Sequence, residues 1–174
     1  MLQNYNTYKI LQLFFDEPTK NFQLREVSRM TKISLPSVIN HISKLESYGF
    51  IKKVKKHTYS SYEADMNSDK FKLYKKIDLL LRLNESEMID YLTKTFVPDV
   101  IVLFGSASRG EDIERSDVDL FIAAKEKNVN LKKFEKIIRR KINLLFEPDI
   151  SKISKELRNN LANGIVLYGY LKVL

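Results

Sequence analysis

The sequence of 174 residues contains no cysteine and no tryptophan, and only two histidines, four prolines and five glycines. The absence of cysteine excludes disulfides, thiolate zinc sites and a catalytic thiol. The two histidines, His41 and His57, are too few for a multi-histidine metal site. Long apolar runs are also missing, because Asp78 and Arg82 interrupt the longest apolar-rich segment, 77–83.

Residues 1–5 lack the basic start and the apolar stretch of a secretion signal. We therefore expect a soluble cytoplasmic protein that makes no membrane contact. A length of 174 residues allows at most two small modules.

Basic side chains outnumber acidic ones by 30 to 22, which gives a net charge of +8 and indicates a polyanionic partner. Half of this excess falls on residues 1–65, which carry ten basic and six acidic side chains. Nucleic acid and nucleotide phosphates are the first partners to consider.

The first fifty residues predict three helices, over 5–15, over 23–30 and from Ser34 to Gly49. The second helix would bury Met30, and Ser34 would cap the third through its side chain. Gly49 is suited to end that helix in a left-handed conformation.

A strand, a turn and a returning strand are expected over 50–63, with four lysines on the first strand. The order of helices and basic hairpin resembles the winged helix-turn-helix of transcription regulators. That resemblance implies binding of double-stranded DNA through the polar face of the third helix and the hairpin, with the contacts made by Ser34, Ser37, Asn40, His41, Lys44, Lys52, Lys53, Lys55 and Lys56. Two alternatives are a merely solvated surface and a protein-binding module.

Residues 66–98 form a helical stretch, expected to break near residues 84–86, with more apolar surface than a solvated linker needs. This segment either packs against its neighbours or forms the interface of a homodimer that pairs two DNA-binding modules.

The character of the sequence changes after Pro98, where the apolar run 100–104 predicts a buried strand. Gly105 and Ser106 then form a small-residue turn into a helix, where backbone N–H groups and a hydroxyl can meet a phosphate. Arg109 lies one turn into that helix, where its guanidinium can also reach phosphate oxygens.

Asp117 and Asp119 are two positions apart on the next expected strand, so their carboxylates project from one face and can share a cation such as Mg²⁺. Acidic residues in the loop before them, among them Asp112, are expected to be merely solvated.

The glycine-serine turn and the Asp-x-Asp pair together resemble the DNA polymerase beta-like nucleotidyltransferases, and in particular the minimal nucleotidyltransferases, often paired with a helical HEPN toxin. The resemblance implies transfer of a nucleoside monophosphate from a triphosphate, most simply ATP, to a hydroxyl acceptor. In that scheme Mg²⁺ is held by Asp117 and Asp119, and the nucleotide by Gly105, Ser106, Arg109 and Ser116.

One position departs from that family, whose third carboxylate corresponds to Asn143 in the strand expected over 141–147. An amide is neutral and a poor Mg²⁺ ligand beside carboxylates, so catalysis is placed in doubt more than nucleotide binding. Glu147 lies too far along the strand to replace it, about 13 Å at ~3.3 Å per residue.

The fold class expected from these segments is α+β. A winged helix-turn-helix over 1–65 is followed by a helical linker over 66–98 and a nucleotidyltransferase domain with a mixed sheet over 99–174. Two hypotheses remain open: a DNA-bound nucleotidyltransferase, or a DNA-binding regulator, in some cases antitoxin-like, whose weakened nucleotidyltransferase domain senses nucleotides.

Overall fold

The computed structural model describes residues 5–56 and 59–172, and for residues 55, 56 and 59 it describes the backbone only. The chain forms two compact units, Met1–Lys75 and Lys76–Leu174. Their boundary falls inside helix α4 (Asp69–Glu85), so the expected linker over 66–98 supplies residues to the cores of both units.

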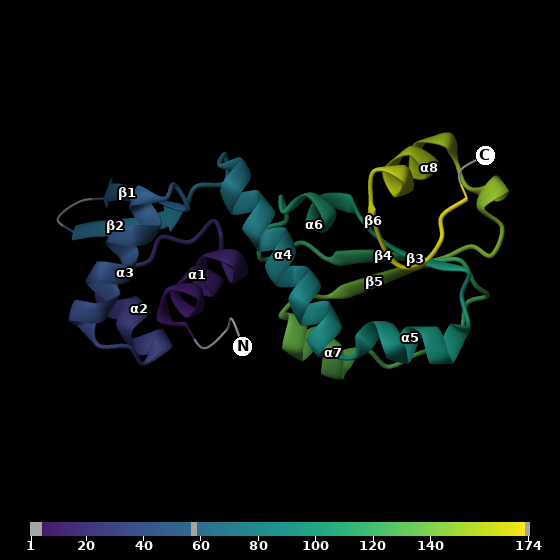
Figure 1. Cartoon of the computed structure of the whole chain (residues 1–174), viewed down its shortest axis with the longest axis horizontal. Coiled ribbons are helices and arrows are strands. Elements are labelled where there is room, and N and C mark those ends of the chain that lie inside the picture. The colour runs from purple at the N-terminus through teal and green to yellow at the C-terminus, as the bar shows by residue number, and fades with distance from the viewer. Residues whose placement is uncertain (1–4, 57–58, 173–174) are drawn as a thin grey trace. The chain divides into compact units, whose positions relative to one another are not determined.

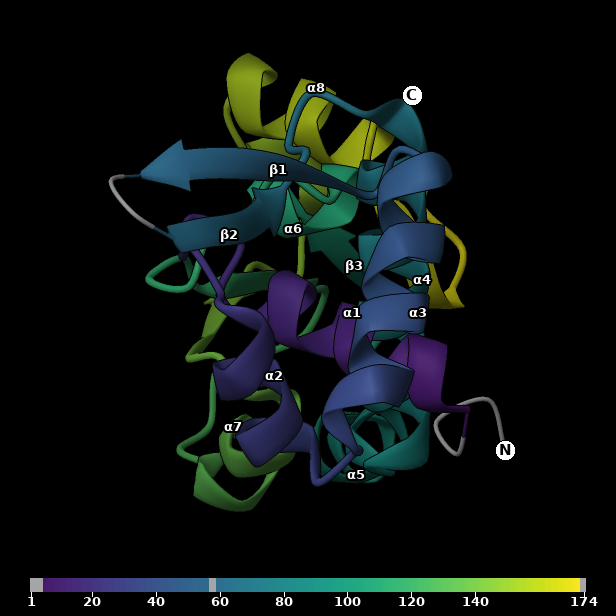
Figure 2. The same cartoon turned by 90° about the vertical axis from the view of Figure 1, so that its left-hand side faces the viewer.

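The first unit contains three helices and a two-stranded antiparallel hairpin (Figures 1 and 2). Its elements before α4 are α1 (Asn6–Asp16), α2 (Leu24–Thr31), α3 (Leu35–Ser47), β1 (Ile51–Lys56) and β2 (Tyr59–Ala64). The expected order of elements is present.

Two details of these helices differ from expectation. Ser34 lies at the N-cap of α3, but its side chain makes no capping hydrogen bond, and Pro36 in the first turn favours the helix start instead. Met30 is 42% exposed, because α2 buries only the narrow side that contains Val27. Gly49, with φ +73°, follows α3 in the left-handed conformation that was expected.

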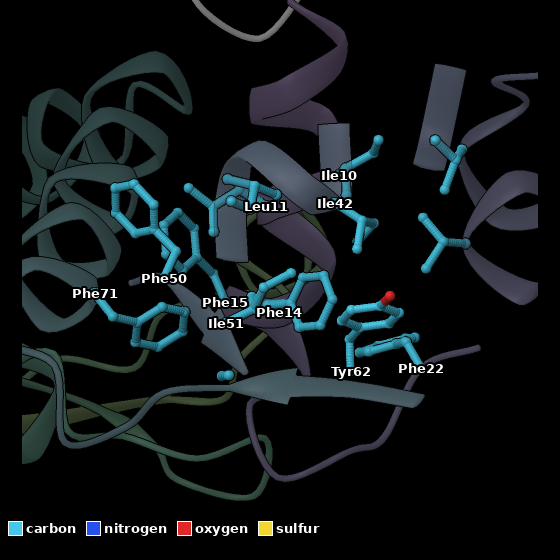
Figure 3. Packing of buried hydrophobic residues seen from close by; sticks show 14 of the residues in the cluster. Ile10, Leu11, Phe14, Phe15, Phe22, Ile42, Phe50, Ile51, Tyr62 and Phe71 are labelled. Atoms are coloured by element: carbon cyan, nitrogen blue, oxygen red, sulfur yellow. The ribbon is translucent and has the colours of Figure 1, made fainter. Parts of the chain in front are cut away.

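Aromatic rings dominate the core of the first unit (Figure 3). Phe14 on α1 meets the edge of Phe22 at 5.0 Å between ring centroids, and Phe15 lies 5.2 Å from Phe71 of α4. Backbone hydrogen bonds in both directions between Phe22 and Tyr62 tie the segment before α2 to the hairpin. The start of α4 is therefore part of this unit.

The second unit is built on a four-stranded mixed sheet, as the sequence predicts (Figure 1). Its elements after α4 are α5 (Met88–Phe96), β3 (Val100–Phe104), α6 (Gly105–Arg109), β4 (Val118–Ile122), α7 (Lys132–Ile138), β5 (Ile142–Phe146), the short 3-10 helix η2 (Ile150–Lys152), α8 (Lys155–Ala162) and β6 (Ile165–Gly169). The strand order is β5-β4-β3-β6, with β3 antiparallel to β4 and β6, and β4 parallel to β5.

The two faces of this sheet are covered differently. On one face, Leu120 and Ile122 pack with residues of α5, α7 and the second half of α4. On the other face, Phe121 packs with Leu161 of α8 and with Ile153, and that cluster is much smaller. One end of this second face, where β3 ends and β4 and β5 begin, is left for polar residues.

The helices in the described part of the chain include none with both the length and the apolar character required to cross a membrane.

Candidate active site

Sheet register brings three distant segments to one place. Asp119, the second residue of β4, pairs with Phe104 of β3 on one side and with Asn143 of β5 on the other. Laterally paired residues project from the same face of a sheet, so the side chains of Asp119 and Asn143 are neighbours. Gly105 follows Phe104 directly and begins α6. The expected glycine turn, carboxylate and Asn143 thus meet at one end of the sheet.

Gly105 lies against the carboxylate of Asp119. A Cβ atom at position 105 would be 2.7 Å from Asp119 Oδ2, closer than van der Waals contact permits. The backbone of Gly105 also has φ +73°, a conformation that side-chain-bearing residues rarely adopt. Both the close approach and the turn therefore require glycine.

Asn143 contacts the same carboxylate from the other side. Its Nδ2 donates a hydrogen bond of 2.9 Å to Asp119 Oδ1. The amide of Asn143 therefore directs its N–H group toward the Asp119 carboxylate, where a carbonyl oxygen would be needed to bind a metal. It orients the Asp119 carboxylate and adds no negative charge to the site.

A comparison with protein-family models matches residues 86–171 to the family described as Polymerase beta, Nucleotidyltransferase. Residues 86–171 are therefore similar to polymerase beta-like nucleotidyltransferase domains. Searches of curated proteins and of solved structures find no match. The matched region begins ahead of residue 99, where the sequence suggested the domain start, and includes α5. The reason is structural, because Met88, Leu92 and Phe96 of α5 belong to the core beneath the sheet.

The carboxylates of Asp117 and Asp119 differ in their surroundings. Asp119 is half-buried within β4, whereas Asp117 is exposed and immediately precedes the strand instead of lying on it. Two carboxylates at this spacing fit one divalent cation that is also bound by phosphate oxygens. Within the described residues, no group of three histidine or acidic side chains is arranged to hold a metal.

Ser116 supports the loop that delivers Asp117. Its Oγ accepts a hydrogen bond of 3.0 Å from the Ile113 N–H, and its own N–H donates to the Ile113 carbonyl at 3.0 Å. On the other side of Asp117, the Val118 N–H donates to the Lys141 carbonyl at 2.8 Å. Ser116 was predicted to bind nucleotide, and the contacts that the structure gives it are those of a turn.

Arg109 is engaged within its own turn. Its Nε donates to Glu111 Oε2 at 2.7 Å and its Nη1 donates to the Gly105 carbonyl at 3.0 Å, which also accepts from the Ser108 hydroxyl at 2.8 Å. Half of the Arg109 side chain is exposed. To bind a phosphate as expected, Arg109 would exchange Glu111 for the phosphate oxygens.

The loop before the Asp pair contains a buried ion pair that sequence reasoning missed. Asp112 is 6% exposed and its Oδ2 lies 3.6 Å from Nε of Arg140, so the expectation that it is merely solvated is wrong. No local pattern signals this pair, because the two residues are far apart in sequence. Glu147 lies just beyond β5, and its Oε1 accepts from the Asp149 N–H, which agrees with its expected absence from the site.

The residues proposed for DNA contact lie on α3 and the hairpin of the first unit. Ser34, Asn40 and Lys44 are exposed, while Ser37 and His41 are half-buried. Nδ1 of His41 is 2.8 Å from the Thr7 hydroxyl of α1, a contact that ties α3 to α1 and that the sequence pattern did not indicate. The exposed polar side of α3 has a shallow hollow lined by Asn40, Ser43, Lys44 and Ser47.

On the hairpin, Lys52 and Lys53 are exposed. Lys52 Nζ pairs with Glu63 Oε1 at 3.3 Å across the two strands, so Lys53 is the less neutralised of the two. The side chains of Lys55 and Lys56, and His57 as a whole, lie outside the described residues.

Proposed function

We propose that the second unit transfers a nucleoside monophosphate from a nucleoside triphosphate, with ATP as the first candidate, to a hydroxyl acceptor. The observation that carries the proposal is the close approach of Gly105 to the Asp119 carboxylate, because a glycine turn proposed to bind phosphate then lies beside the carboxylate proposed to bind the metal. The family match supports nucleotidyl transfer as the reaction class.

Each residue of the site has a distinct part in this proposal. The backbone N–H and hydroxyl of Ser106, with Gly105, bind the triphosphate, and Asp117 and Asp119 hold the Mg²⁺ that accompanies it. Such a cation neutralises charge on the phosphate oxygens. The acceptor oxygen forms a bond to the α-phosphorus, the bond to the bridging oxygen breaks and pyrophosphate leaves. The acceptor proton passes to solvent water, and the amide of Asn143 has no basic atom that could take part.

A second candidate function is favoured by the hydrogen bond from Asn143 to Asp119. With the amide in place, the site can bind Mg²⁺ and triphosphate yet lack the charge that would activate an acceptor hydroxyl. In that case the unit senses nucleotide and controls the first unit as a regulator. A toxin-like protein partner is compatible with either function.

An assay of label transfer separates the two. The purified chain is incubated with Mg²⁺ and α-labelled ATP, alone and with nucleic acid, and ATP binding is measured in parallel. For an enzyme, wild type transfers label and the double variant Asp117→Asn with Asp119→Asn does not. For a sensor, wild type binds ATP in an Mg²⁺-dependent manner without transfer.

Substitution of Asn143 sharpens the result. Asn143→Asp restores a carboxylate beside Asp119, whereas Asn143→Ala removes the amide without adding charge. We expect Asn143→Asp to raise metal-dependent ATP binding and any transfer above the level of Asn143→Ala. If the wild-type chain binds no ATP, both proposed functions of this unit are rejected.

For the first unit we propose a winged helix-turn-helix that binds double-stranded DNA, as a homodimer. Support comes from the exposed polar face of α3, the basic hairpin beside it and the excess of basic residues over 1–65. A mobility-shift assay with genomic DNA fragments tests the binding, and light scattering tests the dimer. Unchanged mobility at low salt would reject the DNA-binding function.

A further inference from the structure

The first unit contains an apolar groove that neither nucleotidyl transfer nor DNA binding uses. Its volume is about 570 Å³, within the range of small-molecule sites. It is formed by α1, the end of α3, the segment between α3 and β1, and the start of α4, and its lining includes Leu11, Leu45, Tyr48, Phe50, Lys70 and Tyr74.

Aromatic side chains form most of the groove wall. The rings of Phe50 and Tyr74 meet edge to face, with centroids 4.9 Å apart. Tyr48 and Tyr74 remain 59% and 45% exposed, so a large part of each side chain is accessible to a ligand. Flat aromatic walls of this kind favour a planar, unsaturated ligand.

Among the described residues that line the groove, Lys70 is the one with a charged side chain. Its Nζ donates to the Tyr48 carbonyl at 3.3 Å and lies 5.9 Å from the centre of the Phe50 ring, which holds the ammonium beside the aromatic wall. An ammonium has three N–H donors, and this contact uses one of them. A charge held at the edge of an apolar surface attracts a ligand of opposite charge.

We propose that this groove binds a small aromatic carboxylate, with its ring against Tyr48 and Tyr74 and its carboxylate on Lys70. The groove lining includes Leu45 of α3, the helix proposed to contact DNA, so the ligand would act as an effector of the first unit. The ligand site itself does not depend on the proposed DNA binding or nucleotidyl transfer.

The probe is 1-naphthoate, with the neutral isostere 1-naphthamide as its matched control, titrated into the full chain labelled at leucine methyl groups. We expect saturable shifts at Leu11 and Leu45, none at Leu161 of the second unit, and at least tenfold weaker binding of the amide, as expected for loss of one charged hydrogen bond. Equal binding of the two compounds, or no saturable shift at Leu11 and Leu45, would overturn the proposal.

Variants of Lys70 test directly whether its charge binds the carboxylate of the ligand. Lys70→Met should weaken naphthoate binding about tenfold and remove the preference over the amide, whereas Lys70→Arg should keep both. Lys9→Met, which removes an exposed lysine of α1 outside the groove, should leave binding unchanged. Unchanged binding in a folded Lys70→Met protein would contradict the proposal. If that variant does not fold, the naphthoate and naphthamide comparison in wild type decides.

The competing occupant is a second copy of the chain. Light scattering of wild type and Tyr74→Ala distinguishes the two. A dimer that dissociates in Tyr74→Ala and binds no naphthoate would assign the groove to self-association and overturn the ligand proposal.

Discussion

The two units place their candidate functional residues in different ways. In the first unit, the residues proposed for DNA contact lie on one helix, α3, and the hairpin that follows it, so the helical period and neighbouring sequence bring them together. In the second unit, Gly105, Asp119 and Asn143 come from three strand ends and meet only through sheet register. The surface on α3 and the hairpin should therefore tolerate substitutions elsewhere in its unit, whereas the site at the end of the sheet depends on correct pairing of the strands.

The hydrophobic cores of the two units also differ in composition. The first unit joins its helices through large rings such as Phe14 and Phe71, while the second packs mainly aliphatic strand residues such as Leu120 between helices. If the units are independent, damage to one core should leave the other folded.

The largest effect is expected from Phe14→Ala. Phe14 is fully buried, so its truncation should lower the free energy of unfolding of the first unit by about 3–5 kcal/mol. Chemical denaturation followed by methyl NMR should show early loss of first-unit signals such as Leu45, with Leu120 retained. Met30→Ala, at an exposed position, is the control and should cost less than about 1 kcal/mol. Simultaneous loss of both sets of signals would show that the units unfold as one.

A smaller loss of stability is expected when the ion pairs of the loop between α6 and β4 are broken. Asp112→Ala removes the carboxylate that faces the nearly buried Arg140 guanidinium and should destabilise the second unit by about 3 kcal/mol. Glu111→Ala breaks the exposed pair with Arg109 and should cost at most about 1 kcal/mol. Urea titrations of the two variants measure the difference, and equal midpoints would contradict the assigned burial of Asp112.

Two glycines with the same backbone conformation provide the next test. Gly49 and Gly105 both have φ +73°, but an added Cβ meets nothing within 4 Å at Gly49 and meets Asp119 at 2.7 Å at Gly105. Gly49→Ala should therefore cost about 1 kcal/mol from backbone strain, and Gly105→Ala about 2–3 kcal/mol. ATP binding should fall only in Gly105→Ala. Equal losses of stability would mean that Asp119 moves aside without cost.

The smallest effect concerns the hairpin. If Lys53 contacts a DNA phosphate, Lys53→Ala should reduce the slope of log K against log salt concentration by about 0.9. Lys125→Ala, at an exposed position in the second unit, should leave the slope unchanged. Fluorescence anisotropy over a range of salt concentrations measures both slopes, and an unchanged slope in Lys53→Ala would remove the hairpin from the proposed interface.

The sequence predicted the elements better than the contacts between them. The apolar run 100–104, the turn at Gly105 and the mixed sheet could be anticipated because strand length and glycine conformation are local properties. The pairing of Asp112 with Arg140 could not, since it depends on how α7 and the loop pack in three dimensions. The capping hydrogen bond expected of Ser34 is absent, although the helix it precedes is present.

The basic excess, the missing cysteines and the spacing of Asp117 and Asp119 were determined by sequence alone, because they are counts and periods along the chain. Only the tertiary structure decided that Asn143 donates to Asp119 and that Gly105 lies against the same carboxylate. Strand register sets both contacts, and register depends on how complete faces of the sheet are buried. The absence of cysteine excluded one chemistry at the outset, while the fold determined how the remaining carboxylates are held.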